Sequence, residues 1–165
     1  MLESPFPVSL TSLEFRQACG QFATGVAILT TIDLAGVPSG MTINSFVSLS
    51  LEPPLVMVAI AHSSNQLSAF ESSGTFAVNF LGEAQRDLST LFARTGDDRF
   101  RDLPWEAGAT GSPILEGIIG ALECRIVERF DAGDHRVFIG EAVEARIAEG
   151  KPLLFFHSAY QNLAG

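Results

Sequence analysis

The segment from Ser39 to Ser50 carries six hydroxyl or amide side chains and no charged residue. Its polar members are Ser39, Thr42, Asn44, Ser45, Ser48 and Ser50. Alternate side chains of an extended strand share a face, so Thr42 and the other even-numbered members would lie on one face and Ser45 on the other. We interpret the segment as a wall of hydrogen-bond donors and acceptors against a ligand that is polar along one edge. The alternative is a solvated edge strand.

Two shorter clusters could also meet a ligand. The run 62–66 (His-Ser-Ser-Asn-Gln) lies where an apolar strand should end and a helix begin, and the first turn of a helix offers free N–H groups to an anion. The alternative there is an ordinary helix cap. The run 133–135 (Gly-Asp-His) forms a tight turn, in which His135 is either solvated or placed to meet a ligand at the mouth of a barrel.

Several familiar chemistries are unsupported by the sequence. It contains no glycine-rich dinucleotide or phosphate-loop motif and no metalloprotease or serine-hydrolase motif. The three histidines are too dispersed to predict a metal site, so we expect none. Cys19 and Cys124 are far apart and not in a C-x-x-C motif, so we expect two buried, small apolar side chains rather than a redox pair.

The charge balance argues against a nucleic-acid partner. The net charge is −9, with ten Lys and Arg against nineteen Asp and Glu, and nucleic-acid binders need a basic patch. The phosphates of an anionic ligand would have to be held by local donors. A 47% hydrophobic composition fills a core and is also compatible with a buried dimer interface. Neither a signal peptide nor a run of about 20 apolar residues is found, so we expect a cytoplasmic protein without a membrane partner.

The hydrophobic pattern predicts a chain rich in short strands. Residues 1–10 are expected to be a flexible lead-in and 11–165 a single domain, whose first helix spans about 12–20 behind a capping box of Thr11 and Glu14. Strands are expected at 26–32, 40–50, 55–61, 75–81, 120–130, 136–145 and 152–157, helices at 65–71 and 83–93, and an irregular excursion at 96–112. Without regular βαβ alternation, this order favours an all-β barrel with helical insertions.

Six blocks of the chain, in order, resemble the short-chain flavin reductase family. They are residues 15–26, 40–54, 76–81, 111–117, 133–135 and 152–160. Each block is weak alone, but together they cover nearly the whole chain. The resemblance implies a mainly β fold, a six-stranded split β-barrel that binds FMN, with a few short peripheral helices.

The resemblance also implies a function. Such a protein is a homodimer that binds FMN or FAD, oxidises NADH or NADPH, and supplies reduced flavin to a partner monooxygenase. Because the cofactors carry out hydride transfer, no catalytic acid or base is expected. Two alternatives are a split-barrel flavoprotein that keeps its flavin and acts on another substrate, and a non-catalytic flavin- or haem-binding protein.

Site residues follow from the resemblance, position by position. The isoalloxazine and ribityl chain would be lined by Pro38, Ser39, Gly40, Met41, Thr42, Asn44 and Ser45, with the backbone of Ala59, Ile60 and Ala61 along the ring. The phosphate end would be held by Ser63, Ser64, Asn65 and Gln66, and Leu91 and Phe92 would touch the flavin. The nicotinamide side would comprise His135, Phe156, His157, Ser158, Ala159 and Tyr160. Relatives often have basic residues where this chain has Asn65 and Gln66, a difference for which Arg94 or Arg99 could compensate.

Overall fold

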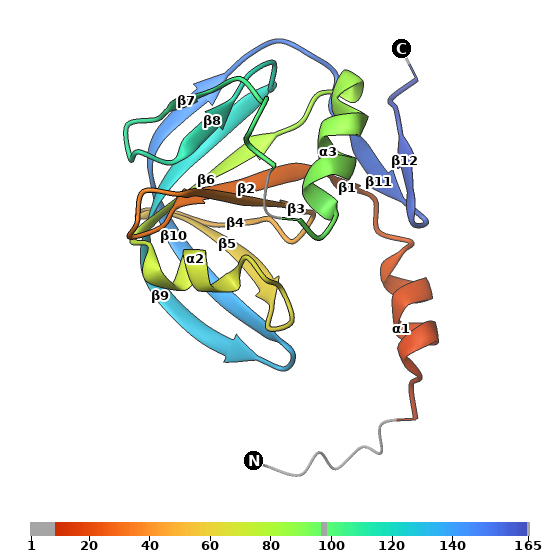
Figure 1. Cartoon of the computed structure of the whole chain (residues 1–165). Coiled ribbons are helices and arrows are strands. Elements are labelled where there is room, and N and C mark those ends of the chain that lie inside the picture. The colour runs from red at the N-terminus through yellow and green to blue at the C-terminus, as the bar shows by residue number, and fades with distance from the viewer. Residues whose placement is uncertain (1–8, 97–98, 165) are drawn as a thin grey trace.

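A seven-stranded antiparallel sheet dominates the computed structural model, which describes residues 9–96 and 99–164 (Figure 1). Most of the expected lead-in, residues 1–8, lies outside the described residues. The order across the sheet is β3-β2-β6-β9-β10-β5-β4. The strand bounds are β2 Ala27–Ile32, β3 Pro38–Ile43, β4 Val47–Leu51, β5 Pro54–Ala61, β6 Thr75–Phe80, β9 Gly120–Ala132 and β10 His135–Ile147.

The sheet curls until its two edges approach each other. Five strand spacings of about 4.8 Å separate β3 from β5 in the sheet order, so a flat sheet would hold them more than about 20 Å apart. Yet Ser45, two residues beyond the end of β3, donates a hydrogen bond of 2.9 Å from its hydroxyl to the carbonyl of Ala59 on β5. The expected mainly β split barrel is therefore confirmed, with seven strands in this sheet rather than six.

The expected strand at 40–50 is wrong as a single element. The chain leaves β3 at Ile43 and resumes at Val47 as β4, which pairs with β5 at the opposite edge of the sheet order. Thr42 and Ser48 therefore do not share a face of one strand. No Gly or Pro marks the break at 44–46, and an alternating polar pattern continues through it, so only the pairing of the strands reveals it.

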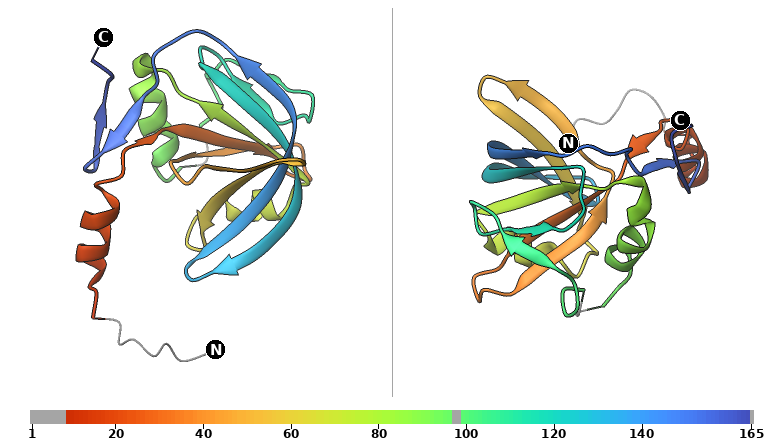
Figure 2. Two further views of the ribbon diagram at one scale, coloured as in Figure 1. Left: turned by 180° about the vertical axis from the view of Figure 1, so that it is seen from behind. Right: turned by 90° about the horizontal axis from the view of Figure 1, so that it is seen from above.

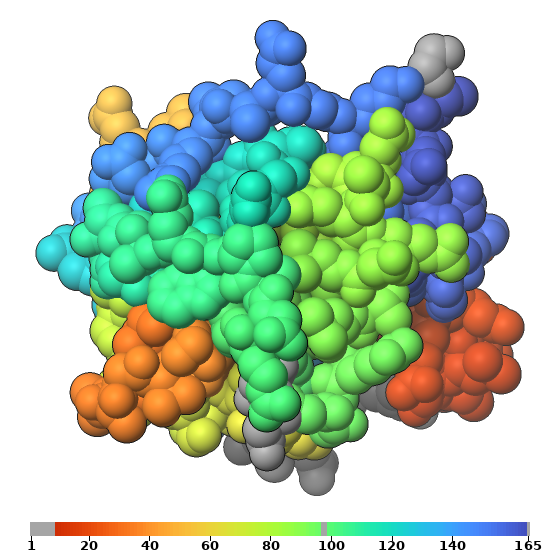
Figure 3. Space-filling view, turned by 45° about the horizontal axis from the view of Figure 1, so that its top comes forward, coloured from red at the N-terminus to blue at the C-terminus, as the bar shows by residue number. Residues whose placement is uncertain are grey.

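Two small sheets flank the barrel. One joins β1 (Thr24–Gly25), β11 (Leu154–Phe156) and β12 (Ala159–Gln161), and the other pairs β7 (Trp105–Ala107) with β8 (Pro113–Leu115). β7 lies inside the stretch expected to be irregular, of which residues 97–98 are outside the described residues. In Figure 3 this stretch (green) lies between α3 and the 33–37 turn (orange) and covers that face of the barrel.

Asn79 holds the smaller β7–β8 sheet to the barrel. Its fully buried amide donates to the hydroxyl of Thr30 at 3.1 Å and to the carbonyl of Pro113 at 3.3 Å, and it accepts the N–H of Leu115 at 2.9 Å. A buried amide is stabilising only when its donors and acceptors are matched, as they are here. This network positions β8 against β2 and β6.

Helices lie at the periphery. They are α1 (Ser12–Cys19), α2 (Leu67–Ser72), the short 3-10 helix η1 (Glu83–Gln85) and α3 (Arg86–Ala93). The predicted capping box of Thr11 and Glu14 is confirmed, as is the inward placement of Leu67 and Phe70. None of the described helices is long and apolar enough to cross a membrane.

The first helix buries none of its residues within the chain. α1 stands beside the barrel, and Phe15 and Phe22 are 57% and 78% exposed (Figure 2). Cys19 is exposed as well, so its expected burial is wrong, because helical periodicity identifies an apolar face but not what covers it. Cys124 is buried as expected, and burial, with a smaller effect of the Glu123 carboxylate, raises the pKa of its thiol to about 12.

Candidate functional site

The outer edge of β3 is the centre of the predicted flavin site. β3 pairs only with β2, so alternate backbone groups point away from the sheet. At Gly40 these groups are held by two side chains: the N–H donates to the amide oxygen of Gln66 at 3.3 Å, and the carbonyl accepts from the guanidinium of Arg99 at 2.6 Å. Strand alternation places the backbone N–H and carbonyl of Thr42 on this same edge.

Gly40 also permits a close approach of α3. A Cβ atom at Gly40 would lie 2.9 Å from Cε1 of Phe92, 3.0 Å from the carbonyl oxygen of Leu29 and 3.2 Å from Cζ of Phe100. Phe92 is fully buried against β3, whereas its predicted companion Leu91 is 40% exposed. Phe92 therefore supports the strand from within the core, and Leu91 is the member of the pair on the surface.

A hydrogen-bond chain links β3 to β12 through α3. The hydroxyl of Thr42 donates to the carbonyl of Ser89 at 2.6 Å, and the hydroxyls of Ser89 and Tyr160 are 2.8 Å apart. The Tyr160 ring packs edge-on against Phe155 and lies under the Arg86 guanidinium, 5.2 Å from the ring centroid. The structure thus joins a residue predicted for the flavin to one predicted for the nicotinamide.

Two neighbouring cavities meet at Asn44. One, of about 250 Å³, is lined by Thr42, Asn44 and Tyr160 together with apolar residues. The other, of about 590 Å³, is lined by Asn44, Ser45 and Ala59 and by apolar side chains of the barrel. The amide of Asn44 is exposed and has no hydrogen-bond partner among the residues that the structure describes. The hydroxyl of Ser45, in contrast, both donates to and accepts from the backbone of Ala59.

The predicted phosphate-end residues lie in the turn between β5 and α2, beside β3. The Ser64 hydroxyl lies 3.9 Å from the sulfur of Met41, and Gln66 reaches Gly40 as described. Gln66 is the N-cap of α2 but makes no side-chain capping bond.

Arg99 is only 8% exposed and its guanidinium donates to the carbonyls of Gly40 and Arg94, so it holds the β3 edge. Arg94 is exposed at the end of α3.

His135 lies at the start of β10, opposite Ala61 of β5. Its Nδ1 is 2.7 Å from a carboxylate oxygen of Asp134, and this hydrogen bond, with the nearby imidazole charge, lowers the pKa of that carboxyl. The backbone N–H of His62 donates to the Asp134 carbonyl, which ties the turn to the end of β5. Figures 1 and 2 show the tip of this β9–β10 hairpin well away from β11 and β12. Within one chain, His135 and Tyr160 are therefore not brought together.

The β11–β12 hairpin contains the rest of the predicted nicotinamide side, with Phe156 on β11, His157 and Ser158 in the turn, and Ala159 and Tyr160 on β12. His157 and Ser158 have φ angles of 49° and 59°, in the left-handed region that non-glycine residues rarely adopt. The His157 ring stacks on Phe156 with centroids 4.0 Å apart, and its backbone N–H donates to the carbonyl of Gly20. This turn faces α1 rather than β3.

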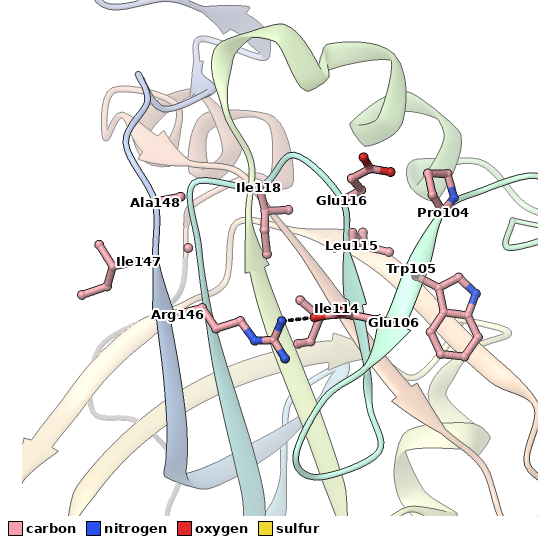
Figure 4. Close-up of a pocket in the computed structure, with 11 residues that line it drawn as sticks. Pro104, Trp105, Glu106, Ile114, Leu115, Glu116, Ile118, Arg146, Ile147 and Ala148 are labelled. Carbon is pink, nitrogen blue, oxygen red and sulfur yellow. Dashed lines mark hydrogen bonds and ion pairs between the residues drawn. The ribbon is translucent and has the colours of Figure 1, made fainter.

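A further cavity lies apart from all the predicted site residues. It measures about 410 Å³ and is walled by Trp105, Ile114 and Ile118, with the ion pair between Arg146 and Glu106 beside them (Figure 4). The described residues also contain no group of three or more His, Cys, Asp or Glu side chains that could hold a metal ion.

Sequence reasoning missed Ser89 as a contributor. Its signal was a polar residue three positions before Phe92, on the buried face of an amphipathic helix. A buried hydroxyl needs a hydrogen-bond partner, so the position of Ser89 on the buried face predicts that its side chain bonds to another group. The partner, Tyr160, is 71 residues away, and nothing local to the sequence identifies it.

Comparisons with known proteins agree with this geometry. A family model described as the flavin reductase like domain matches residues 19–164. The chain is 42% identical over 154 residues to the FMN reductase (NADH) SmoA of Agrobacterium fabrum, covering 93% of this chain and 87% of the relative. It is 40% identical over 147 residues to the reductase component of the flavin-dependent trigonelline monooxygenase of Acinetobacter baylyi, covering 89% of this chain but only 47% of that relative.

Solved structures give the same result. The NADH:FAD oxidoreductase SgcE6 of Streptomyces globisporus, in complex with NAD and FAD fragments, superposes with a TM-score of 0.87 at 32% identity, covering 92% of each chain. The flavin reductase of the styrene monooxygenase of Pseudomonas putida superposes with a TM-score of 0.83 at 36% identity, covering 91% of this chain and 97% of that one.

Replacing Gly40 by alanine tests the packing at the centre of the site. The added methyl group would overlap Phe92 and the Leu29 carbonyl, and overpacking of this kind costs about 1–3 kcal/mol. We expect the free energy of unfolding of Gly40→Ala, measured in urea, to fall by that amount. Gly74→Ala is the matched control, because a Cβ there would meet no atom within 4 Å. Equal stability of the two variants would contradict the close approach.

Proposed function

The chain belongs to the flavin reductase like family, and from this premise we propose that it is an NAD(P)H:flavin oxidoreductase that transfers a hydride from NADH or NADPH to FMN or FAD. The observation that carries the proposal is the cavity shared by Thr42, Asn44 and Tyr160. It sets residues of the proposed flavin strand beside one of the proposed nicotinamide residues. The name of the Agrobacterium relative, an FMN reductase that uses NADH, supports the same assignment.

The donors along β3 fit a flavin. Among the described residues, the side chains of Ser39, Asn44 and Ser63 have no hydrogen-bond partner, and they flank an edge whose backbone groups also face outward. A ribityl phosphate requires such neutral donors where few cations are available. The apolar walls of the adjoining 590 Å³ cavity suit a flat aromatic ring.

The protein's part in the reaction is to orient and to exclude water. When bound, the flavin supplies the acceptor for the hydride, so no side chain has to donate or remove a proton in that step. Asn44 and the β3 edge would orient the flavin, and Ser89 fixes the Tyr160 hydroxyl, which would border the nicotinamide. Holding two reactants in line contributes much of the rate in such a reaction.

We propose in addition that the reduced flavin is released to a separate oxygenase in the cytoplasm, where NADH and NADPH are regenerated. The names of two relatives support this release, since the Acinetobacter and Pseudomonas proteins are described as the reductases of monooxygenases. The chain spans less than half the length of some relatives, 47% of the Acinetobacter protein and 40% of one from Rhizobium meliloti.

The function is tested with purified protein, both flavins and both nicotinamides in all combinations. We expect loss of NADH or NADPH absorbance at a rate that saturates with added FMN or FAD. Flavin that acts as a substrate must be added in excess over protein, whereas a permanently bound flavin need not. Oxidation of the nicotinamide at a rate independent of added flavin would contradict release to a partner.

We propose that the active form is a homodimer whose flavin site is completed near the subunit boundary. Exposed apolar side chains on α1, in the turn after it and on β4, among them Phe15, Phe22 and Leu51, lie uncovered in the single chain. His135 and Tyr160 are also apart in one chain, and a second copy could bring them together. Light scattering should give about twice 17.6 kDa at micromolar concentration. A fully active monomer would rule the proposal out.

Asn44→Ala tests the flavin strand. Loss of one hydrogen bond costs about 0.5–1.5 kcal/mol, which corresponds to an increase of roughly twofold to tenfold in the flavin dissociation constant. The measurement is a flavin titration followed by fluorescence. Asn162→Ala, an exposed asparagine outside the strands, serves as the control and should bind flavin normally. An unchanged dissociation constant in folded Asn44→Ala would refute this placement.

His135→Ala tests the nicotinamide side. Because hydride transfer needs no base here, the His135 imidazole should only help to position the nicotinamide. Its loss should therefore raise the KM for NADH severalfold and leave the flavin affinity nearly intact. The change should appear mainly in kcat/KM for the nicotinamide. His62→Ala is the control, because His62 is a nearby exposed imidazole that pairs with Asp131. Weakened flavin binding with normal NADH saturation would assign His135 to the flavin instead.

A further inference from the structure

A cavity of about 560 Å³ lies between α1 and the turn of the β11–β12 hairpin. It is separate from the two cavities at Asn44. Its lining comprises Leu13, Arg16, Gln17, Gly20, Gln21, His157 and Ser158. Five of these seven residues have polar side chains, and none is acidic. Unlike the two cavities at Asn44, which contain neither acidic nor basic residues, this cavity contains an arginine.

The polar groups of this α1 cavity are not committed elsewhere. Arg16 forms no ion pair or hydrogen bond through its side chain with the described residues, and the same holds for the amides of Gln17 and Gln21. Other arginines differ: Arg125 pairs with Glu141, and Arg136 with Asp131. The cavity therefore offers one guanidinium and several neutral donors without a counter-charge, which is the chemistry that an anion requires.

The β11–β12 turn that lines the other side of the α1 cavity has an uncommon backbone conformation. His157 and Ser158 both have positive φ, where a two-residue hairpin turn normally uses Asn and Gly. The N–H of His157 is held by the carbonyl of Gly20, at the end of α1. Strain of this kind collects at binding sites, and here His157 and Ser158 line the same cavity as Arg16.

The same hairpin connects the α1 cavity to the proposed reaction site. Phe155 and Tyr160 line the cavity shared with Thr42 and Asn44, and the turn that joins their strands lines the α1 cavity. Ser158 precedes Tyr160 by two residues, a span of about 7 Å along a strand. A nicotinamide dinucleotide carries its diphosphate one ribose away from the nicotinamide, so a ligand with its ring beside Tyr160 can reach the turn with its phosphates.

We propose that the α1 cavity binds the diphosphate of the nicotinamide dinucleotide, with Arg16 as the charged donor and Gln17, Gln21 and Ser158 as neutral donors. The proposal rests on the proposed function, since it completes the nicotinamide half of that site. FAD contains a diphosphate too, and the experiment must separate these two sources. The assignment gives the polar residues of α1 a role in binding, beside the exposed Phe15, which supports the proposed dimer.

The test removes the charge of Arg16 while keeping a polar, though shorter, side chain. In Arg16→Gln, we expect the KM for NADH to rise about fivefold to tenfold, because hydrogen bonds to charged groups are the stronger ones. The KM for dihydronicotinamide riboside, which has no phosphate, should be the same as in the unaltered protein. Arg16→Lys should restore part of the loss. Arg125→Gln removes the same charge from β9 and should leave both KM values unchanged.

Equilibrium binding gives a readout that does not depend on turnover. Calorimetry on flavin-free protein should show ADP-ribose binding that Arg16→Gln weakens by a similar factor. If the protein fails to oxidise NADH yet binds ADP-ribose through Arg16, the proposed function fails and the anion site stands. Three results for Arg16→Gln would overturn the site. The first is unchanged affinity for NADH and ADP-ribose, and the second is weakened binding of FAD with NADH binding unchanged. The third is a rise in the KM for dihydronicotinamide riboside equal to the rise for NADH.

Discussion

The close approach of α3 to β3 at Gly40 is the contact on which the candidate site depends. With no Cβ at this position, Phe92 packs directly against the strand, and the Arg99 and Gln66 side chains take up the outward backbone groups of the same residue. The strand edge is thereby held in place without a neighbouring strand. A side chain at Gly40 would push α3 outward and separate Thr42 from Ser89, which links the strand to Tyr160.

A second constraint operates at the break between β3 and β4. Val47 pairs with Met57, and the same antiparallel register continued by two residues would set Ser45 opposite Ala59. No backbone ladder forms there, and the Ser45 hydroxyl makes both hydrogen bonds to Ala59 instead. The Ser45 side chain therefore takes the place of a backbone partner for β5 at the point where the backbone of its own segment leaves the sheet. The neighbouring Asn44 makes no such bond and lines both cavities.

The polar groups along β3 that would meet a flavin are hydroxyls, amides and backbone groups rather than carboxylates or thiols. The buried thiol of Cys124 has a strongly raised pKa, so it stays protonated and inert. Hydroxyls, amides and backbone groups suffice where cofactors supply the reacting atoms. A net charge of −9 gives no general attraction for anionic cofactors, so the uncommitted donors proposed at β3 and beside α1 would have to act at short range.

Local patterns determined much of the fold. The capping box at Thr11, the buried strands β2 and β6, and the β9–β10 hairpin follow from residues close together in the sequence, and a family resemblance added the barrel and the candidate residues. Such features could be predicted because helical and strand periodicities are set by neighbouring side chains. The resemblance named Thr42 and Tyr160 as site residues but did not show that a single serine joins them.

The tertiary structure alone decided the rest. Gly40 is 59 residues from Arg99, and Ser89 is 71 residues from Tyr160, so neither contact leaves a local pattern. The break after Ile43, the exposure of Cys19 and the separation of His135 from β12 likewise depend on which surfaces meet when the sheet curls. Periodicity shows which face of an element is apolar, but only the packed chain determines what that face contacts, because those partners come from distant parts of the sequence.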